Sequence, residues 1–338
     1  MAGMRQGLTC NRQESVYCAD RPAEFERLML DLVLLVVPVF GLVALGYFAA
    51  LTGLIGERSN EGITAFLFVV GAPALLFKLI TAAVFPETFP WGFWIAYYVG
   101  MGVVWLASMM LAATLFKTSH GDAVIAGLAA GQANTVLIGI PIILKAYGDQ
   151  AGFPIAMLLA VNLPITMTVA TLMLEGTRSA SGGAVVRKLA RGLTTHPLLI
   201  AMAAGVLAQV VGFRPSGPFG ATLGMLADTT VPLSLFALGL SLKAYGVKAD
   251  LPVALMISLL RLIVHPAIAY VVAAHVFALP PVWTGTVVLF AAMPAGINAY
   301  LFAARYGQGV GIASTSVALS TVLSVATTVL WLRVLGIG

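Results

Sequence analysis

Charged side chains are scarce in this chain. Asp, Glu, Lys and Arg make up only 9% of its 338 residues, whereas hydrophobic residues make up 60%. A soluble domain carries about 25% charged residues, so this chain cannot cover itself with a polar surface. The composition excludes an ordinary soluble protein and predicts an integral membrane protein whose surroundings are a lipid bilayer.

Cysteine is almost absent, because Cys10 and Cys18 are the only two and both lie near the N-terminus. The body of the chain therefore has no cysteine for a disulfide framework or a metal site, and we expect no metal and no cofactor. The basic residues lie in short loops and form no patch interleaved with stacking aromatics, so we expect no nucleic-acid partner.

Motifs of enzymes and ATP-driven pumps are missing as well. The sequence contains no Gly-x-x-x-x-Gly-Lys phosphate loop, no His-Glu-x-x-His pair and no Gly-x-Ser-x-Gly nucleophile motif. It also has no paired carboxylates in its apolar segments. We therefore expect that the protein is not an enzyme, and that any energy for transport comes from ion or substrate gradients.

Two polar segments flank the apolar ones. Residues 1–28 have no apolar run of the signal-peptide type, and Met29 stands just before the first apolar segment. We interpret 1–28 as a disordered N-terminal tail. Residues 176–195 contain the run Ser179–Gly183 and then Arg187, Lys188 and Arg191, which is typical of a flexible cytoplasmic linker.

Hydropathy and helix breakers divide the rest into ten candidate membrane spans, each of about the length that crosses a bilayer. Five lie in 29–175 and five in 196–338. An odd number of spans in each half makes the second half enter the membrane from the opposite side. The predicted spans are 32–51, 62–80, 92–115, 122–146, 153–174, 196–213, 219–242, 250–277, 283–304 and 311–335.

The two halves repeat one layout at a fixed offset. Pro38 and Pro197 are separated by 159 positions, and the same offset relates Gly53 to Gly212 and Tyr147-Gly148 to Tyr306-Gly307. Most matched residues start or end helices, so the duplicated feature is a pattern of helix boundaries. Such duplication within an apolar chain is a common plan for secondary transporters.

Loop charges predict the orientation. Nine Lys and Arg residues lie in the loops after spans 1, 3, 5, 7 and 9, and two lie in the loops after spans 2, 4, 6 and 8. Because basic loops stay in the cytoplasm, both termini are predicted to lie on the outer side.

Spans 4 and 9 both carry helix-breaking residues near their middles. A proline removes a backbone donor and frees the carbonyl four residues earlier, so Pro141 frees that of Leu137 and Pro294 that of Phe290. Broken backbone must be buried in protein or line a wet cavity, and half-helix N-termini suit a carboxylate. The predicted substrate-binding residues are Gln132, Asn134, Thr135, Pro141, Asn162, Pro294 and Asn298.

Ionisable residues inside apolar spans are candidates for ion coupling or gating. Asp228 either couples a proton or sodium ion or caps a helix segment before Pro232. Arg261 and His265 are four residues apart on one helix face, and Arg261 could pair with Asp228, orient a mobile segment or attract an anion. Lys78 is expected to extend to the membrane interface.

Several stretches together resemble the auxin efflux carrier family. They are Val37–Phe40 with Gly46–Phe48, Ala72–Lys78, Gln132–Thr135 with Gly139–Pro141, Val231–Gly239, Arg261 with His265-Pro266, and Met293–Ala299. The similarity runs from about residue 29 to the end. The chain lacks the long cytoplasmic loop of plant PIN-type carriers, which favours the bacterial malonate-carrier-like branch in the cell inner membrane.

The resemblance implies an all-α fold of two inverted five-helix repeats, like that of sodium/proton antiporters and bile-acid symporters, with broken helices 4 and 9 crossing. It implies a scaffold of spans 1, 2, 6 and 7 that forms a homodimer, a moving core of spans 3–5 and 8–10, and a substrate site at Asn134, Pro141, Pro294 and Asn298. We therefore expect a secondary carrier of a small organic anion, such as malonate, malate or an auxin-like acid. The alternative is a channel or a ligand-sensing receptor on the same fold.

Overall fold

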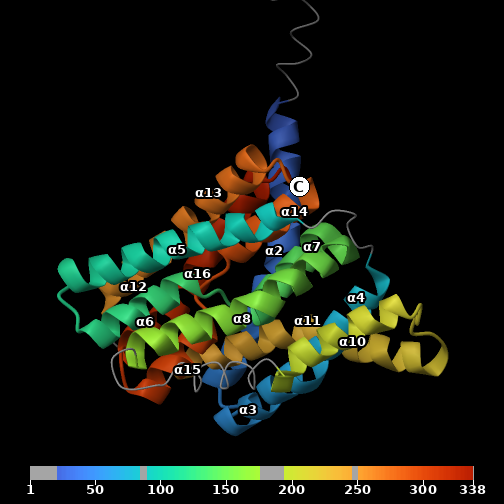
Figure 1. The fold of residues 1–338 in the computed structure, drawn as a ribbon, viewed down its shortest axis with the longest axis horizontal. Coiled ribbons are helices and arrows are strands. Elements are labelled where there is room, and N and C mark those ends of the chain that lie inside the picture. The colour runs from blue at the N-terminus through green and yellow to red at the C-terminus, as the bar shows by residue number, and fades with distance from the viewer. Residues whose placement is uncertain (1–20, 84–89, 176–193, 246–249, 338) are drawn as a thin grey trace, which may run out of the picture.

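The computed structural model describes residues 21–83, 90–175, 194–245 and 250–337, and these residues are helical throughout apart from short connections (Figure 1). No strand occurs among them, and their one isolated β-bridge joins Ala133 to Ala295. The expectation of an all-helical protein is thus met in the described residues.

The helices of the first half are α2 (Arg21–Leu51), α3 (Glu57–Phe66), α4 (Ala72–Ala82), α5 (Trp91–Thr114), α6 (His120–Gly131), α7 (Ile140–Tyr147) and α8 (Gly152–Glu175). Those of the second half are α10 (Pro197–Val210), α11 (Gly217–Tyr245), α12 (Leu251–Leu259), α13 (His265–Tyr270), α14 (Pro281–Ala292), α15 (Ile297–Tyr306) and α16 (Val310–Val334). The π-helical segments η1 (Leu67–Gly71), η2 (Thr135–Gly139), η4 (Leu260–Val264) and η5 (Val271–Val276) and the short 3-10 turn η3 (Gly148–Ala151) join some of these helices into longer stretches.

Six helical stretches of the described chain are long and apolar enough to cross a membrane, and three further apolar helices are shorter. Large apolar side chains also point outward, among them Leu54, Met110 and Val322, which are 81%, 64% and 65% exposed. An outer surface of this kind is stable against lipid and not against water. The protein is therefore a multi-pass membrane protein.

Helix boundaries recur at the offset of 159. Helices α2, α7 and α8 end at residues 51, 147 and 175, and α10, α15 and α16 end at 210, 306 and 334. The glycines after two of these pairs share a positive φ: it is +75° at Gly53 and +72° at Gly212, and +63° at Gly148 and +66° at Gly307. Only glycine adopts such a φ without strain, which accounts for glycine at both positions of each pair.

Three of the π-helical segments end two residues before a proline. Segment η1 precedes Pro73, η2 precedes Pro141 and η4 precedes Pro266. A proline in a helix clashes with the carbonyl four residues earlier, and a π-turn widens the helix at that point. These helices therefore continue past their prolines.

The helices pack as two groups. In the first group, α2 lies along α11, and α4 lies against both α10 and α11. In the second, α5 packs on α6 and α13, and α12 packs on α16. The two groups meet where α11 contacts η2 and α4 contacts α8.

The ends of the described chain bear on two sequence predictions. Helix α2 begins at Arg21, so residues 21–28, which we expected within a disordered tail, are helical. Residues 1–20 and most of the predicted linker, residues 176–193, lie outside the described residues.

Glycines set the close packing of α2 on α11. A Cβ added at Gly239 would lie 2.0 Å from the Val43 carbonyl oxygen, and one added at Gly46 would lie 2.1 Å from that of Phe236. Because both obstacles are backbone atoms, the helices would have to separate. Close approach through small residues is a usual basis of helix association in membranes.

We predict that Gly239→Ala lowers the unfolding temperature of the detergent-purified protein, because forced overpacking costs about 1–3 kcal/mol. The matched control is Gly224→Ala in the same helix, where an added Cβ meets nothing within 4 Å. It should keep or slightly raise the unfolding temperature. Equal unfolding temperatures for the two variants would contradict the packing described here.

Candidate functional site

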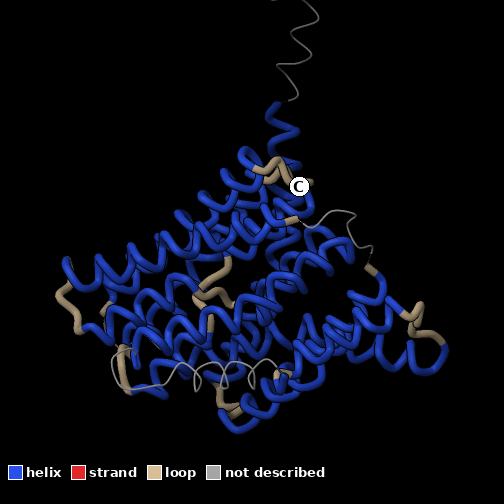
Figure 2. The backbone as a smooth tube through the Cα atoms, viewed as in Figure 1, coloured by secondary structure: helices blue, strands red, loops and turns tan. Residues whose placement is uncertain are grey.

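Two helical stretches are interrupted at the centre of the molecule, as the sequence predicted (Figure 2). One helix stops at Gly131 and resumes at Thr135, and the other stops at Ala292 and resumes at Ile297. The interruptions lie side by side and antiparallel, since the Asn134 N–H donates to the Pro294 carbonyl and the Gly296 N–H to the Gln132 carbonyl, both at 2.8 Å. We call this paired backbone, residues 132–134 and 293–296, the crossing.

The crossing leaves no room for a side chain at Gly296. A Cβ there would lie 2.8 Å from the Ala133 carbonyl oxygen and 3.1 Å from the Gln132 side chain. On the other side, the Ala295 N–H donates to the Ser320 hydroxyl of α16 at 3.0 Å. The geometry of the crossing is therefore fixed by both its neighbours and its own backbone.

Carbonyls freed by prolines find partners on distant helices. The Leu137 carbonyl, four residues before Pro141, accepts from the Ser234 hydroxyl of α11 at 3.1 Å. The Leu262 carbonyl, four residues before Pro266, accepts from the Trp331 indole at 2.8 Å. Each bond removes the several kcal/mol that an unpaired carbonyl costs away from water.

Arg261 is fully buried and binds the ends of both broken helices. Its Nη1 donates to the Ala130 and Gly131 carbonyls at 3.1 and 2.7 Å. Its Nε donates to the Met293 carbonyl at 2.8 Å and its Nη2 to that of Phe290 at 3.1 Å. Helix C-termini carry partial negative charge. Two such ends therefore compensate the positive charge of the guanidinium in place of a carboxylate.

His265 completes this arrangement. Its Nδ1 lies 3.0 Å from Nη1 of Arg261, and its Nε2 lies 3.2 Å from the Tyr97 carbonyl oxygen. An arginine can only donate, so Nδ1 accepts, and the proton stays on Nε2. The predicted proximity of Arg261 and His265 is confirmed, whereas the predicted alternative of an Arg261–Asp228 pair is wrong.

The opposite ends of the interruptions carry free donors. The first N–H groups of a helix have no partner within it. Among the described residues, the N–H groups of Thr135, Val136, Ile297 and Asn298 donate to no backbone carbonyl outside their helices. Asn134 occupies the position before the helix but makes no capping bond, and its Nδ2, although buried, is unpaired in the described chain. These donors suit an anion.

Two buried acceptors that belong to predicted substrate residues are also unpaired in the described part of the chain. They are Oε1 of Gln132, in the crossing, and Oδ1 of Asn162, in α8. Both residues are at most 2% exposed. A buried polar atom without a partner costs about 1–3 kcal/mol, which such a site recovers when a ligand or water binds.

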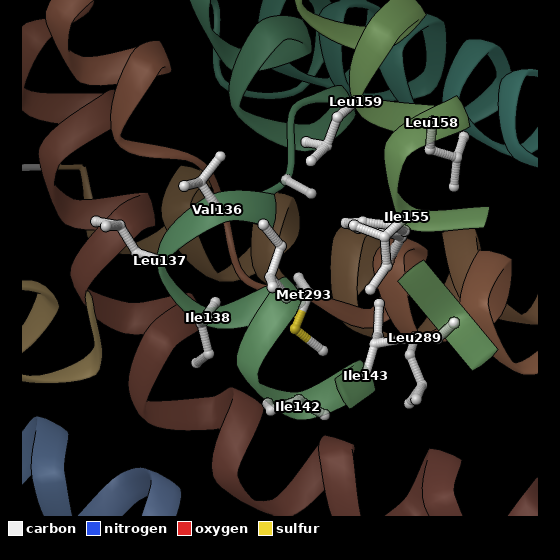
Figure 3. Close-up of a cluster of buried hydrophobic side chains, with 14 of the residues drawn as sticks. Val136, Leu137, Ile138, Ile142, Ile143, Ile155, Leu158, Leu159, Leu289 and Met293 are labelled. Atoms are coloured by element: carbon white, nitrogen blue, oxygen red, sulfur yellow. The ribbon is translucent and has the colours of Figure 1, made fainter. Parts of the chain in front are cut away.

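The remaining predicted substrate residues lie at or beside the crossing. Thr135 and Pro141 are buried, Pro294 lies within the crossing, and Asn298 is half-buried in the first turn of α15. Figure 3 shows what supports them: apolar side chains of η2 and α7 pack with residues of α8 and α14. The labelled residues are Val136, Leu137, Ile138, Ile142, Ile143, Ile155, Leu158, Leu159, Leu289 and Met293.

Asp228 and Lys78 form an ion pair at 2.9 Å between α11 and α4, with side chains 73% and 42% exposed. Helix α11 runs without a break from Gly217 to Tyr245, with Pro232 inside it. The alternative that Asp228 caps a helix segment is therefore wrong. Lys78, which we expected to extend toward the interface, instead contacts Asp228.

Three residues that support the site were not among the predicted residues: Tyr97, Ser234 and Trp331. Ser234 lies inside the Val231–Gly239 stretch, so that stretch was the available signal for it. Nothing local marks Trp331, because the carbonyl that it binds lies 69 positions away in the sequence.

This combination of apolar helices, a buried crossing and free polar groups defines a membrane transporter. The sequence model of the family described as "Membrane transport protein" matches residues 31–332. The chain belongs to this family, and its resemblance to the auxin efflux carriers is confirmed. The family and the relatives below are transporters and not enzymes.

Similar proteins include a "Putative malonate transporter" of Rhizobium meliloti, 29% identical over 88% of this chain and 94% of the relative. An uncharacterized transporter of Methanothermobacter thermautotrophicus is 25% identical over 89% of this chain and 97% of the relative. The uncharacterized transporter YfdV of Escherichia coli is 23% identical over 88% of this chain and 96% of the relative.

We predict that Arg261→Met lowers the unfolding temperature strongly, because four buried carbonyls lose their bond to the guanidinium and each acceptor left unpaired costs about 1–3 kcal/mol. The control is Arg305→Met, which makes the same change at an exposed position in the last turn of α15. Thermal unfolding of the purified variants measures the difference. Similar unfolding temperatures would show that Arg261 does not hold the crossing.

Proposed function

We propose that the protein is a secondary transporter of a small organic anion, a mono- or dicarboxylate such as malonate or malate, or an auxin-like acid. The family supplies the class of function, and the name of the relative from Rhizobium meliloti supports an acid of malonate size. The substrate's carboxylate binds at the N-termini of η2 and α15, where partial positive charge and free N–H groups meet.

One observation carries this proposal: the buried, unpaired Nδ2 of Asn134 stands beside helix N-termini whose N–H groups are free in the described chain. A purely structural break would have its donors paired, as Arg261 and Ser234 pair the carbonyls. Asn298 donates from the other broken helix, and Gln132, Thr135 and Asn162 contact the rest of the substrate.

Transport proceeds by alternating access of the elevator type, on a fold of ten spans in two inverted repeats. The packing groups support this division: α2, α3, α4, α10 and α11 form the scaffold, and the remaining helices form the core that carries the crossing. The core moves against the scaffold and opens the site to each side of the membrane in turn.

The protein lies in the cell inner membrane with both termini on the outer side, and it forms a homodimer through the scaffold. The distribution of basic loops supports this orientation. A proton or sodium ion couples to transport at Asp228, a carboxylate inside the apolar helix α11. Lys78 holds that carboxylate.

A channel or a ligand-sensing receptor on the same fold is the rival function. Counterflow separates the two in proteoliposomes. A carrier exchanges external labelled substrate for unlabelled substrate loaded inside, and it accumulates the label transiently. A channel or a receptor produces no such accumulation.

We predict that Asn134→Ala reduces counterflow of labelled substrate at least tenfold, because the substrate loses a charge-assisted bond of about 1.5–3 kcal/mol. The amount of variant in the membrane is measured in parallel. Asn60→Ala serves as the control, since Asn60 binds Ser241 at the far end of the scaffold. Counterflow at the wild-type rate in Asn134→Ala would refute the assigned role.

We predict that Asp228→Asn removes the dependence of net uptake on a proton or sodium gradient and leaves exchange intact, because the variant keeps the shape of the residue but loses its charge. Uptake with and without each imposed gradient measures this. If wild-type uptake ignores both gradients, Asp228 has no coupling role.

A further inference from the structure

The charges around the crossing limit the net negative charge of a substrate that can bind there. This inference rests on the proposed function and concerns the ionic form of the substrate. Four half-helix ends meet at the crossing: the C-termini of α6 and α14, and the N-termini of α15 and of the continuous stretch Thr135–Tyr147 formed by η2 and α7.

Ionised side chains near the crossing are limited to one. In α5–α8 and α12–α16, every other Lys, Arg, Asp or Glu of the described chain lies in a terminal turn: Asp122, Lys145, Glu175, Arg305 and Arg333. The connections next to these helices hold Lys117, Asp149 and Asp250. His265 adds no charge, because its Nδ1 accepts a hydrogen bond from Arg261. Arg261 is therefore the only full charge in the interior of these helices.

The partial charges can be summed. A helix terminus carries roughly half an elementary charge, positive at the N-terminus and negative at the C-terminus. Arg261 hydrogen-bonds both C-termini, so its single positive charge offsets their two halves. The two N-termini remain, and together they amount to about one positive charge.

The unpaired side chains specify the rest of the ligand. Among the described residues, Nδ2 of Asn134 is a buried donor without an acceptor, and Oε1 of Gln132 is a buried acceptor without a donor. Oδ1 of Asn162 and the hydroxyl of Tyr97 are buried and unpaired as well. Gln132 lies next to the α15 N-terminus, because its side chain approaches Gly296. A matching ligand carries one carboxylate and, at its other end, a group that donates a hydrogen bond.

We propose that the site binds a singly charged anion with a hydrogen-bond donor at its far end, so that a short dicarboxylate enters as its singly protonated form. The carboxylate lies at the two N-termini and Asn134, and the protonated carboxyl donates to Oε1 of Gln132. The proton enters with the ligand and stays on it, and no side chain has to take it up.

The free energies of protonation and of charge burial favour the singly protonated dicarboxylate over the dianion. Protonating a carboxylate costs about 1.4 kcal/mol for each pH unit above its pKa. Burying a second carboxylate without a counter-charge costs several kcal/mol. Within about two pH units of the second pKa of the diacid, binding the hydrogen-dicarboxylate is therefore the less costly route.

Equilibrium binding to the purified full-length protein in detergent tests this. The dissociation constants of malonate and of monomethyl malonate are measured by calorimetry across the pH range above the second pKa of malonic acid, with and without sodium. Monomethyl malonate has the same single charge at every pH in this range. It therefore controls for any titration of the protein, including that of Asp228 and His265.

We expect the dissociation constant of total malonate to rise about tenfold per pH unit, while that of monomethyl malonate stays constant. A malonate constant that is independent of pH, or becomes so in sodium, would overturn the inference, because the dianion would then be the bound species. The proposed function would survive that result. If neither compound bound at any pH, the assignment of a small-anion site would itself fail.

The variant Gln132→Met tests separately whether the protonated carboxyl of malonate donates a hydrogen bond. Gln132→Met removes the acceptor and keeps the length of the side chain, so malonate affinity should fall about three- to tenfold, the value of one hydrogen bond. Affinity for monomethyl malonate, which has no donor at that end, should change less than twofold. Equal losses for both ligands would exclude the predicted contact with the protonated carboxyl.

Discussion

Every polar group of a backbone that is cut off from water needs a partner, and this requirement governs the centre of the protein. The crossing breaks two helices and exposes four carbonyls at their C-terminal ends. Arg261 binds all four, and the crossing's own antiparallel hydrogen bonds hold its two segments together. Without these bonds, two interrupted helices in an apolar surrounding would be too costly to form.

Backbone groups with and without hydrogen-bond partners lie on opposite sides of the helix interruptions. Carbonyls at the C-termini are paired by Arg261, and proline-freed carbonyls by Ser234 and Trp331. Donors at the N-termini lack partners among the described residues, as do the side-chain atoms of Gln132, Asn134 and Asn162. In the proposed function, structural stability and ligand recognition thus use opposite sides of the two helix interruptions.

Much of the fold could be predicted from sequence, because glycine and proline act locally. Gly53, Gly148, Gly212 and Gly307 marked helix ends through a backbone conformation that only glycine tolerates, and Pro141 and Pro294 marked the interruptions. The partners of Arg261 and Lys78 could not be predicted. A local pattern shows that a buried charge needs compensation, but only the packing of α4 on α11 or of η4 on α6 decides which group supplies it.

Arg261 also has a consequence for how the chain is made. Its guanidinium binds the end of α6 from the first half and the end of α14 from the second half, which is synthesised after Arg261 itself. Until α14 has entered the bilayer, half of these acceptors are missing, and water or lipid headgroups must solvate the guanidinium. Biogenesis of the two halves is therefore interdependent, and neither repeat separated from the other could retain the buried arrangement of the whole.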